Sequence, residues 1–171
     1  MIKFKYLTKD LLEWARELHN DPEVLCNLTD PHIVSKKEQK QWFKKLQKSK
    51  SSERLVVWVD KQPIGLVRVD NLDFDNKSVC IGLDIHKDFR GKGYAKKIYY
   101  RLFERYFEQY HLNRIWLLVA DYNTRARHIY TSLGFQEEGA QREALYKKYI
   151  YYNYIMMSIL RREYYAKYSI I

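Results

Sequence analysis

The sequence predicts a layered α/β fold, in which helices flank a mixed sheet within a single domain. The first half of the chain contains short apolar runs separated by turn residues, which is typical of strands. From Val79 onward, strand-like and helix-like segments alternate, and this order is typical of an α/β layer fold. The chain has 171 residues, of which 46% are hydrophobic and 16% aromatic. This composition is enough to build one sizeable core.

The first half is expected to carry a strand, three helices and a hairpin. Asp10 is placed to cap the first helix, and Ser35 and Glu38 form a capping box for the third. Turn residues at 60–63 separate the two strands of the hairpin. The expected elements are, in order, a strand at 2–7, helices starting at 10, 23 and 35, and strands at 55–59 and 64–69.

The second half is expected to alternate strands and helices. Apolar residues alternate from Val79 to Ile85, which predicts a half-buried strand. From Ala95 the apolar residues recur at helical spacing, at Ile98, Tyr99, Leu102, Phe103, Tyr106, Phe107 and Tyr110. The remaining expected elements are a buried strand at 115–119, a helix at 123–134, one or two strands from 135, and an apolar run at 149–157 inside the sheet. The structure of the tail at 161–171 is left open.

A glycine-containing loop joins the strand at 79–85 to the long helix. Its sequence is Arg90-Gly91-Lys92-Gly93-Tyr94-Ala95. Unpaired N–H groups and the positive end of the helix dipole favour an anion at such a helix N-terminus, and glycine lets a phosphate approach the backbone. A plain strand-to-helix turn is the competing interpretation, because a short glycine loop is by itself a weak signal.

A second motif lies in the next strand–helix segment. Asn123 is placed to cap that helix, Tyr130 lies on its apolar stripe, and Gly134 follows its end. Taken together, the chain resembles the GNAT superfamily of acetyl-CoA-dependent N-acetyltransferases, and within it the RimJ/RimL-like branch. The motifs that carry this resemblance are Arg90-x-x-Gly93-x-Ala95 and Asn123-x-x-Ala126-x-x-x-Tyr130-x-x-x-Gly134-Phe135.

The resemblance covers about residues 1–160 and includes the segments 20–24, 35–43 and 139–142. It implies one GNAT domain at 1–171, with 161–171 as a C-terminal tail. It also implies a mixed, mostly antiparallel sheet of about seven strands, whose central parallel pair splays apart at the cofactor. One departure is Asn153, where the branch often carries aspartate. This departure bears on substrate specificity more than on the cofactor.

The resemblance also assigns a cofactor site. The loop backbone would hold the diphosphate of acetyl-CoA, while the side chains of Arg90 and Lys92 either add charge-assisted hydrogen bonds or point to solvent. The pantetheine arm would pair with the strand end at 85–87, where an N–H could polarise the thioester carbonyl. Asn123 could bind this arm while it caps its helix. The predicted cofactor-binding residues are Ile85, His86, Lys87, Arg90, Gly91, Lys92, Gly93, Tyr94, Ala95, Asn123 and Tyr130.

Two residues are predicted to act in catalysis. Tyr130 would donate a proton to the leaving coenzyme A thiolate, and its competing interpretation is a core residue of its helix. Asp84 would deprotonate the incoming amine, directly or through water, although His86 shares its strand face and a solvated strand end competes. Cys80 lies on that face without a visible partner base, so direct transfer is favoured over an acetyl-cysteine intermediate. The cysteine and histidine spacings indicate no metal site.

The composition favours an anionic partner. The chain carries 31 Lys and Arg against 21 Asp and Glu, a net charge of +10. Acetyl-CoA is itself such an anion. The charge also favours an acidic acceptor, such as a nucleotide-linked amino sugar, over a polyamine, and a protein N-terminal amine is the other candidate. Acceptors are expected at a wall formed by residues 7–43 and the last strands.

A cytoplasmic location is expected from what the sequence lacks. No apolar run approaches the ~20 residues of a transmembrane helix, and no signal peptide opens the chain. Cys26 and Cys80 form no CxxC pair, which favours a reducing compartment. No membrane partner is expected, and the apolar tail leaves a homodimer open.

The leading function is therefore an acetyl-CoA-dependent N-acetyltransferase that works by direct attack of a primary amine. Two other classes compete with it. A nucleic-acid-binding module is compatible with the interleaved tyrosines and basic residues, but the charges are scattered over amphipathic helices and no recognition motif is present. The second alternative is a sensor that keeps acetyl-CoA without turnover.

Overall fold

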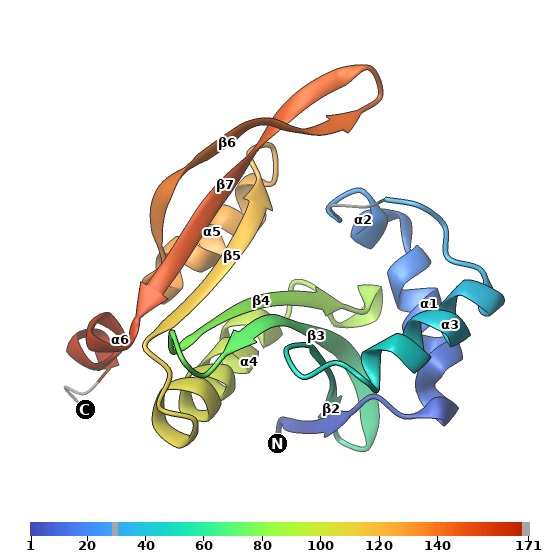
Figure 1. Cartoon of the computed structure of the whole chain (residues 1–171), viewed down its shortest axis with the longest axis horizontal. Helices are drawn as coiled ribbons and strands as arrows, with labels where there is room; N and C mark the ends of the chain where they lie inside the picture. Colours follow the sequence, from blue (N-terminus) through green and yellow to red (C-terminus); the bar gives the residue numbers. More distant parts are fainter. Residues whose placement is uncertain (29–30, 169–171) are drawn as a thin grey trace. The chain divides into compact units, whose positions relative to one another are not determined.

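A computed structural model describes residues 1–28 and 31–168 of the chain. Seven strands form one mixed sheet in the order β1-β2-β3-β4-β5-β7-β6 (Figure 1). The strands are β1 (Lys3–Tyr6), β2 (Glu53–Val59), β3 (Gln62–Asp73), β4 (Ser78–Ile85), β5 (Arg114–Ala120), β6 (Gln136–Lys147) and β7 (Ile150–Leu160). The α-helices are α1 (Leu12–Asn20), α2 (Pro22–Leu25), α3 (Lys36–Leu46), α4 (Tyr94–Phe103), α5 (Thr124–Leu133) and α6 (Arg161–Tyr168).

The pairing confirms the predicted mixed sheet. β1 with β2, β2 with β3, β5 with β7, and β6 with β7 are antiparallel. β4 and β5 are parallel, and their register runs from Ser78 opposite Arg114 to Cys80 opposite Trp116. The pairing thus involves the N-terminal ends of these two strands. This is the parallel pair expected at the centre of the sheet.

The described residues divide into two compact units. The first unit comprises Met1–Leu72 and Ile81–Ile98, and the second comprises Asp73–Cys80 and the residues from Tyr99 onward. Strand β4 and helix α4 therefore contribute residues to both units. Each unit is described by itself below, and the assignment of 1–171 to a single domain stays a prediction.

The core of the first unit joins the first three helices to the strands. Leu18 on α1, Val24 on α2 and Phe43 on α3 are buried in one cluster with Val56 of β2 and Leu66 of β3. Helix α3 begins with the predicted capping box, in which Ser35 and Glu38 bind each other's backbone N–H groups. The expected cap at Asp10 is wrong. Residues 9–11 form a 3₁₀ turn that follows Thr8, and α1 begins only at Leu12.

The core of the second unit is aromatic. The helical apolar stripe predicted for the long helix is buried, including Tyr99, Phe103, Tyr106 and Phe107. The helix is not uniform, however, because α4 passes into a π-helical segment at Glu104–Gln109. In the same unit β5 pairs along its whole length with β7, and β7 with β6. Figure 1 shows β6 and β7 as a long hairpin beside β5.

Residues 161–168 of the tail form helix α6, whose side chains cap helix α5. Lys167 Nζ donates to the carbonyl of Ser132 at 2.8 Å, and the Tyr168 hydroxyl donates to that of Leu133 at 2.9 Å. These carbonyls lie in the last turn of α5, where helical partners are missing. The Tyr164 ring packs 5.4 Å from that of Phe103. Residues 169–171 lie outside the described residues, and a homodimer through the tail stays a prediction.

Candidate active site

The loop between β4 and α4 has the conformation that an anion site requires. After β4, a 3₁₀ turn at Lys87–Phe89 leads into an extended Arg90, and α4 starts at Tyr94. Gly91 and Gly93 have φ angles of +75° and +77°, which other residues rarely adopt. A Cβ atom at either glycine would meet no atom within 4 Å. The backbone angles, and not crowding, therefore require glycine, and both peptide groups are open to a ligand.

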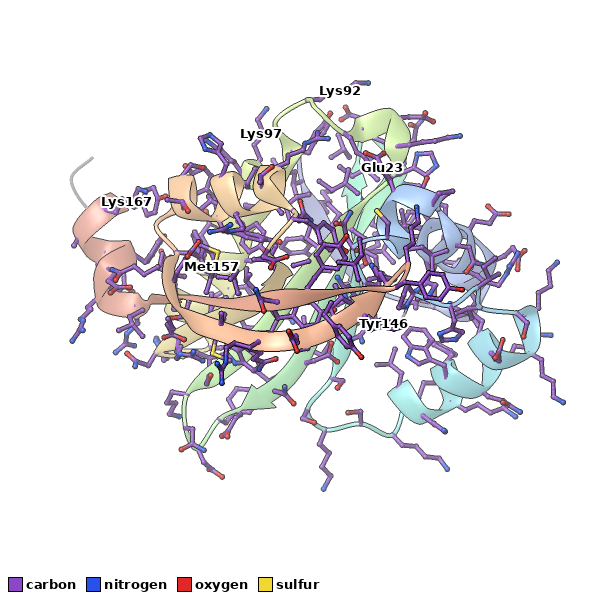
Figure 2. All side chains as sticks on the ribbon, turned by 90° about the horizontal axis from the view of Figure 1, so that it is seen from above. Glu23, Lys92, Lys97, Tyr146, Met157 and Lys167 are labelled. Atoms are coloured by element: carbon purple, nitrogen blue, oxygen red, sulfur yellow. The ribbon has the colours of Figure 1, made fainter. Side chains whose placement is uncertain are left out.

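Positive charge surrounds this loop. The first four N–H groups of α4 have no partner within the helix, and the helix dipole adds partial positive charge. The lysines of the loop and of the first turn, Lys92, Lys96 and Lys97, are exposed. Figure 2 shows Lys92 and Lys97 extending from the ribbon. The residues present therefore fit a diphosphate.

The side chain of Arg90 belongs to neither predicted alternative, since it points neither at a ligand nor into solvent. Its guanidinium is only 17% exposed. Nε donates to the carbonyl oxygen of Ile85 at 2.8 Å, Nη2 donates to Oδ1 of Asp21 at 2.9 Å, and Nη1 donates to Glu23. Arg90 therefore ties the start of the loop to the end of β4 and to the first turn of α2.

Asp21 receives several hydrogen bonds at once. Its Oδ1 also accepts from the backbone N–H groups of Glu23 and Val24, at 3.0 and 3.2 Å, and so caps α2. Burial alone would raise the pKa of Asp21, but the hydrogen bonds from Arg90 and the Val24 amide outweigh it and hold the pKa below its usual value. The Asp21 carboxylate therefore stays ionised beside Arg90.

The second motif adopts the predicted local structure. Asn123 caps α5, and its side-chain oxygen accepts from the N–H of Ala126 at 3.1 Å. Gly134 ends the helix in the left-handed conformation, with φ +100°. Between these ends, the Tyr130 ring lies edge-on to that of Tyr99, with centroids 5.7 Å apart, and 5.6 Å from that of Phe135. The rings position Tyr130 without making it a fully buried core residue.

Asp84, the predicted base, is held by an arginine. Its carboxylate pairs with Arg68 through two contacts, Nε to Oδ2 at 2.9 Å and Nη2 to Oδ1 at 3.3 Å. A Cβ at Gly82 would approach the Arg68 guanidinium to 2.8 Å, so this glycine leaves room for the pair. The pair orients the carboxylate on β4. Its role as a base stays a prediction, as does the alternative role of His86.

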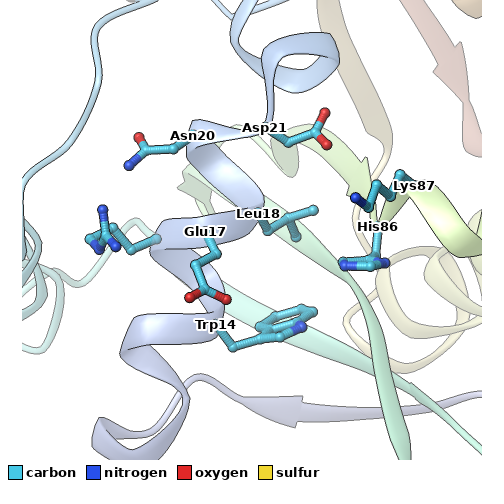
Figure 3. Close-up of a pocket in the computed structure, with 8 residues that line it drawn as sticks. Trp14, Glu17, Leu18, Asn20, Asp21, His86 and Lys87 are labelled. Carbon is cyan, nitrogen blue, oxygen red and sulfur yellow. The ribbon is translucent and has the colours of Figure 1, made fainter.

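A pocket of about 350 Å³ lies in the first unit, between α1 and the end of β4. Figure 3 shows Trp14, Glu17 and Leu18 on α1, with His86 and Lys87 facing them from the end of β4. The full lining is Trp14, Arg16, Glu17, Leu18, Asn20, Asp21, His86 and Lys87. Sequence reasoning expected acceptors along residues 7–43 but did not single out Trp14 or Glu17. Trp14 had been assigned only to the apolar face of its helix.

Asn153, the departure from the family pattern, has a structural role in the second unit. Its backbone N–H and its side-chain amide both donate to Oδ2 of Asp121, at 3.0 and 2.9 Å. Its side-chain oxygen accepts from the N–H of Glu143 at 2.9 Å. An aspartate at 153 would place a second carboxylate against Asp121. The amide is therefore required by this neighbour.

Asn153→Asp is expected to destabilise the protein by about 1–3 kcal/mol at neutral pH, because two carboxylates would replace a hydrogen-bonded pair. Thermal unfolding would show this as a Tm lower by roughly 2–10 °C. The deficit should shrink as the pH falls and one carboxyl is protonated. The control is Asn113→Asp, the same change at an exposed residue of the same unit. Equal melting of the two variants would contradict this role of Asn153.

Two further classes of site were searched for. Within residues 1–28 and 31–168, no group of three or more His, Cys, Asp or Glu could hold a metal ion. In the same residues, no helix is long and apolar enough to cross a membrane.

Comparison with known proteins decides the family. Residues 4–136 match the acetyltransferase (GNAT) domain. The chain belongs to this family. It is an N-acetyltransferase with acetyl-CoA as the acetyl donor, and the predicted fold, enzyme class and cosubstrate are thereby confirmed.

Individual relatives of the GNAT chain include two kinds of acetyltransferase. The putative ribosomal N-acetyltransferase YdaF of Bacillus subtilis is 34% identical over 99 residues, 58% of this chain and 54% of that protein. The spermidine N(1)-acetyltransferase of Escherichia coli is 25% identical over 168 residues, 98% of this chain and 90% of that protein. The crystal structure of spermidine N-acetyltransferase from Vibrio cholerae in complex with CoA and spermine has a TM-score of 0.89 at 27% identity. That likeness covers 95% of this chain and 97% of the other.

Proposed function

We propose that this GNAT enzyme acetylates a primary amine of a small polyamine of the spermidine type. The support is twofold. The similarity to spermidine acetyltransferases extends over nearly the whole chain, whereas the similarity to the ribosomal acetyltransferase covers 58% of it. The pocket beside α1 also has the chemistry that a flexible cation needs.

The pocket offers anionic and aromatic groups to an ammonium. Glu17 is exposed there, and the Asp21 carboxylate lies in the same lining. The cation of this wall, Arg16, is already bound, because Nη2 donates to Glu13 at 2.8 Å and Nη1 donates to the carbonyl of Val34 at 3.2 Å. The Trp14 indole adds a face on which a cation can rest. These groups favour a polyamine over a phosphate-bearing acceptor.

The net charge of +10 favoured an acidic acceptor at the sequence level, but it does not describe this pocket. Many of the basic side chains lie on exposed faces of α3 and α4, and selectivity depends on the groups that line the site. A positive net charge slows the encounter with a polycation without changing which groups it meets in the pocket. Nucleotide amino sugars and protein N-termini therefore become the alternatives that the experiment tests.

The proposed roles of the residues follow from the chemistry of the transfer. The loop at 90–95 holds the diphosphate, and the strand end at 85–87 pairs with the pantetheine arm. Tyr130 donates a proton to the sulfur as it leaves. A lysine-like amine, with a pKa of about 10.4, is protonated at neutral pH and needs a base, a role that we give to Asp84. Asn123 adds a contact to the pantetheine arm while it caps α5.

The test is turnover with acetyl-CoA, followed by thiol release, against spermidine, spermine, a nucleotide amino sugar and a peptide with a free N-terminus. Spermidine or spermine is expected to give the highest kcat/KM, and Glu17→Gln is expected to raise the KM for the polyamine. Faster turnover of the amino sugar or the peptide would refute the polyamine assignment. Coenzyme A binding without turnover of any amine would instead support a sensor. Steeply salt-dependent RNA binding, unaffected by acetyl-CoA, would support a nucleic-acid-binding module.

A further inference from the structure

Arg90 connects two parts of the first unit that bind different ligands. Its backbone opens the glycine loop, which the proposed function assigns to the diphosphate. Its side chain pairs with Asp21, which lines the proposed amine pocket, although Arg90 itself is not among the residues of that lining. The third contact of its guanidinium, to the carbonyl of Ile85, fixes it to the end of β4. One side chain therefore fixes the loop, β4 and α2 relative to one another.

We infer that Arg90 is a positioning residue through which Asp21, in the wall of the amine pocket, sets the affinity of the loop for acetyl-CoA. A loop that is already held in its binding conformation loses less conformational freedom when the ligand binds. The Asp21–Arg90 pair supplies this order, because it restrains the residue directly before Gly91. This inference rests on the proposed place of the diphosphate at the loop.

Simple electrostatics predicts the opposite effect of Asp21. Coenzyme A is an anion, so removing a nearby negative charge should strengthen its binding. If Arg90 were instead a direct ligand of the diphosphate, removing Asp21 would free its guanidinium for that role, which should also strengthen binding. A positioning role alone predicts that the loss of the Asp21 charge weakens binding. The sign of the effect therefore separates the three explanations.

The experiment measures the Kd for coenzyme A by calorimetry, with no amine present, in Asp21→Asn, Arg90→Gln and the double variant. Asparagine is as good an N-cap as aspartate, so α2 keeps its cap while the ion pair is lost. Asp21→Asn is expected to raise the Kd about three- to tenfold, the effect of losing one charged hydrogen bond. The double variant is expected to bind no more weakly than Arg90→Gln alone. Glu23→Gln removes the more exposed carboxylate, 65% exposed against 18% for Asp21, and should raise the Kd less.

Asp70→Asn is the matched control, because it removes the same kind of carboxylate from another arginine pair of the first unit. Asp70 Oδ1 lies 3.0 Å from Nη1 of Arg54, and neither residue lines the pocket. This variant should leave the Kd unchanged. Tighter or unchanged binding in Asp21→Asn, or additive losses in the double variant, would overturn the inference. If Gly93→Glu left the Kd unchanged, the loop assignment itself would fail, and the two failures are thus distinguishable.

Discussion

Tyr130→Phe is expected to lower kcat by about 10²- to 10⁴-fold, the usual range for a lost general acid, while coenzyme A binding changes little. Phenylalanine keeps the ring that packs edge-on against Tyr99 and beside Phe135. The fold of α5 should therefore survive, and only the phenolic hydroxyl is lost. Steady-state kinetics with saturating polyamine, together with calorimetric titration of coenzyme A, would separate the two effects.

The matched control for this variant is Tyr110→Phe. Tyr110 lies in the second unit and its hydroxyl also has a partner, because it accepts from Nη2 of Arg105 at 2.7 Å. Losing that hydroxyl should cost stability at most and leave kcat intact. An unchanged kcat in Tyr130→Phe would show that Tyr130 only packs against its aromatic neighbours. Equal losses in both variants would point to a general effect on the fold.

The two motifs could be predicted from sequence because their structure is local. A glycine at positive φ, an asparagine cap and a C-terminal glycine each act within a few residues of themselves. The structure shows all three, at Gly93, Asn123 and Gly134. The capping box at Ser35 was predictable for the same reason, since both partners lie within one helical turn.

The partners of the charged side chains could not be predicted, because they depend on tertiary contacts. The carboxylate that binds Arg90 lies 69 residues earlier in the chain, so no local pattern links the two. Strand alternation placed Asp84 on one face of β4 but could not show that Arg68 of β3 would hold it. The same holds for Asn153 and Asp121, which are 32 residues apart.

Net charge also says little about the acceptor site. A count over the whole chain averages the lysine-rich helix faces with the pocket, where Glu17 and Asp21 lie beside Trp14. Sequence reasoning therefore favoured an acidic acceptor, whereas the lining of one small pocket suits a cation. The π-helical segment at Glu104–Gln109 is a similar case, because its apolar stripe has ordinary helical spacing.

Gly93→Glu is expected to abolish measurable coenzyme A binding. Two effects add at this position. The φ of +77° costs a residue with a side chain about 1–2 kcal/mol, and the new carboxylate would stand where the diphosphate is proposed to lie. Calorimetric titration of coenzyme A, with circular dichroism to confirm folding, would measure the loss.

Gly93→Ala separates these two effects, because a Cβ at this position meets open space and alanine adds only the backbone strain. It should weaken binding about tenfold, which corresponds to roughly 1.4 kcal/mol, and the further loss in the glutamate variant then measures repulsion between anions. Gly139→Glu, at an exposed glycine of β6 that also has open space around its Cβ, should leave the affinity intact. Undiminished affinity in Gly93→Glu would mean that coenzyme A binds elsewhere, and the lysines around the loop would then be ordinary surface charge. Retention in the alanine variant with loss in the glutamate variant is the pattern that only an anion seated at this helix N-terminus produces.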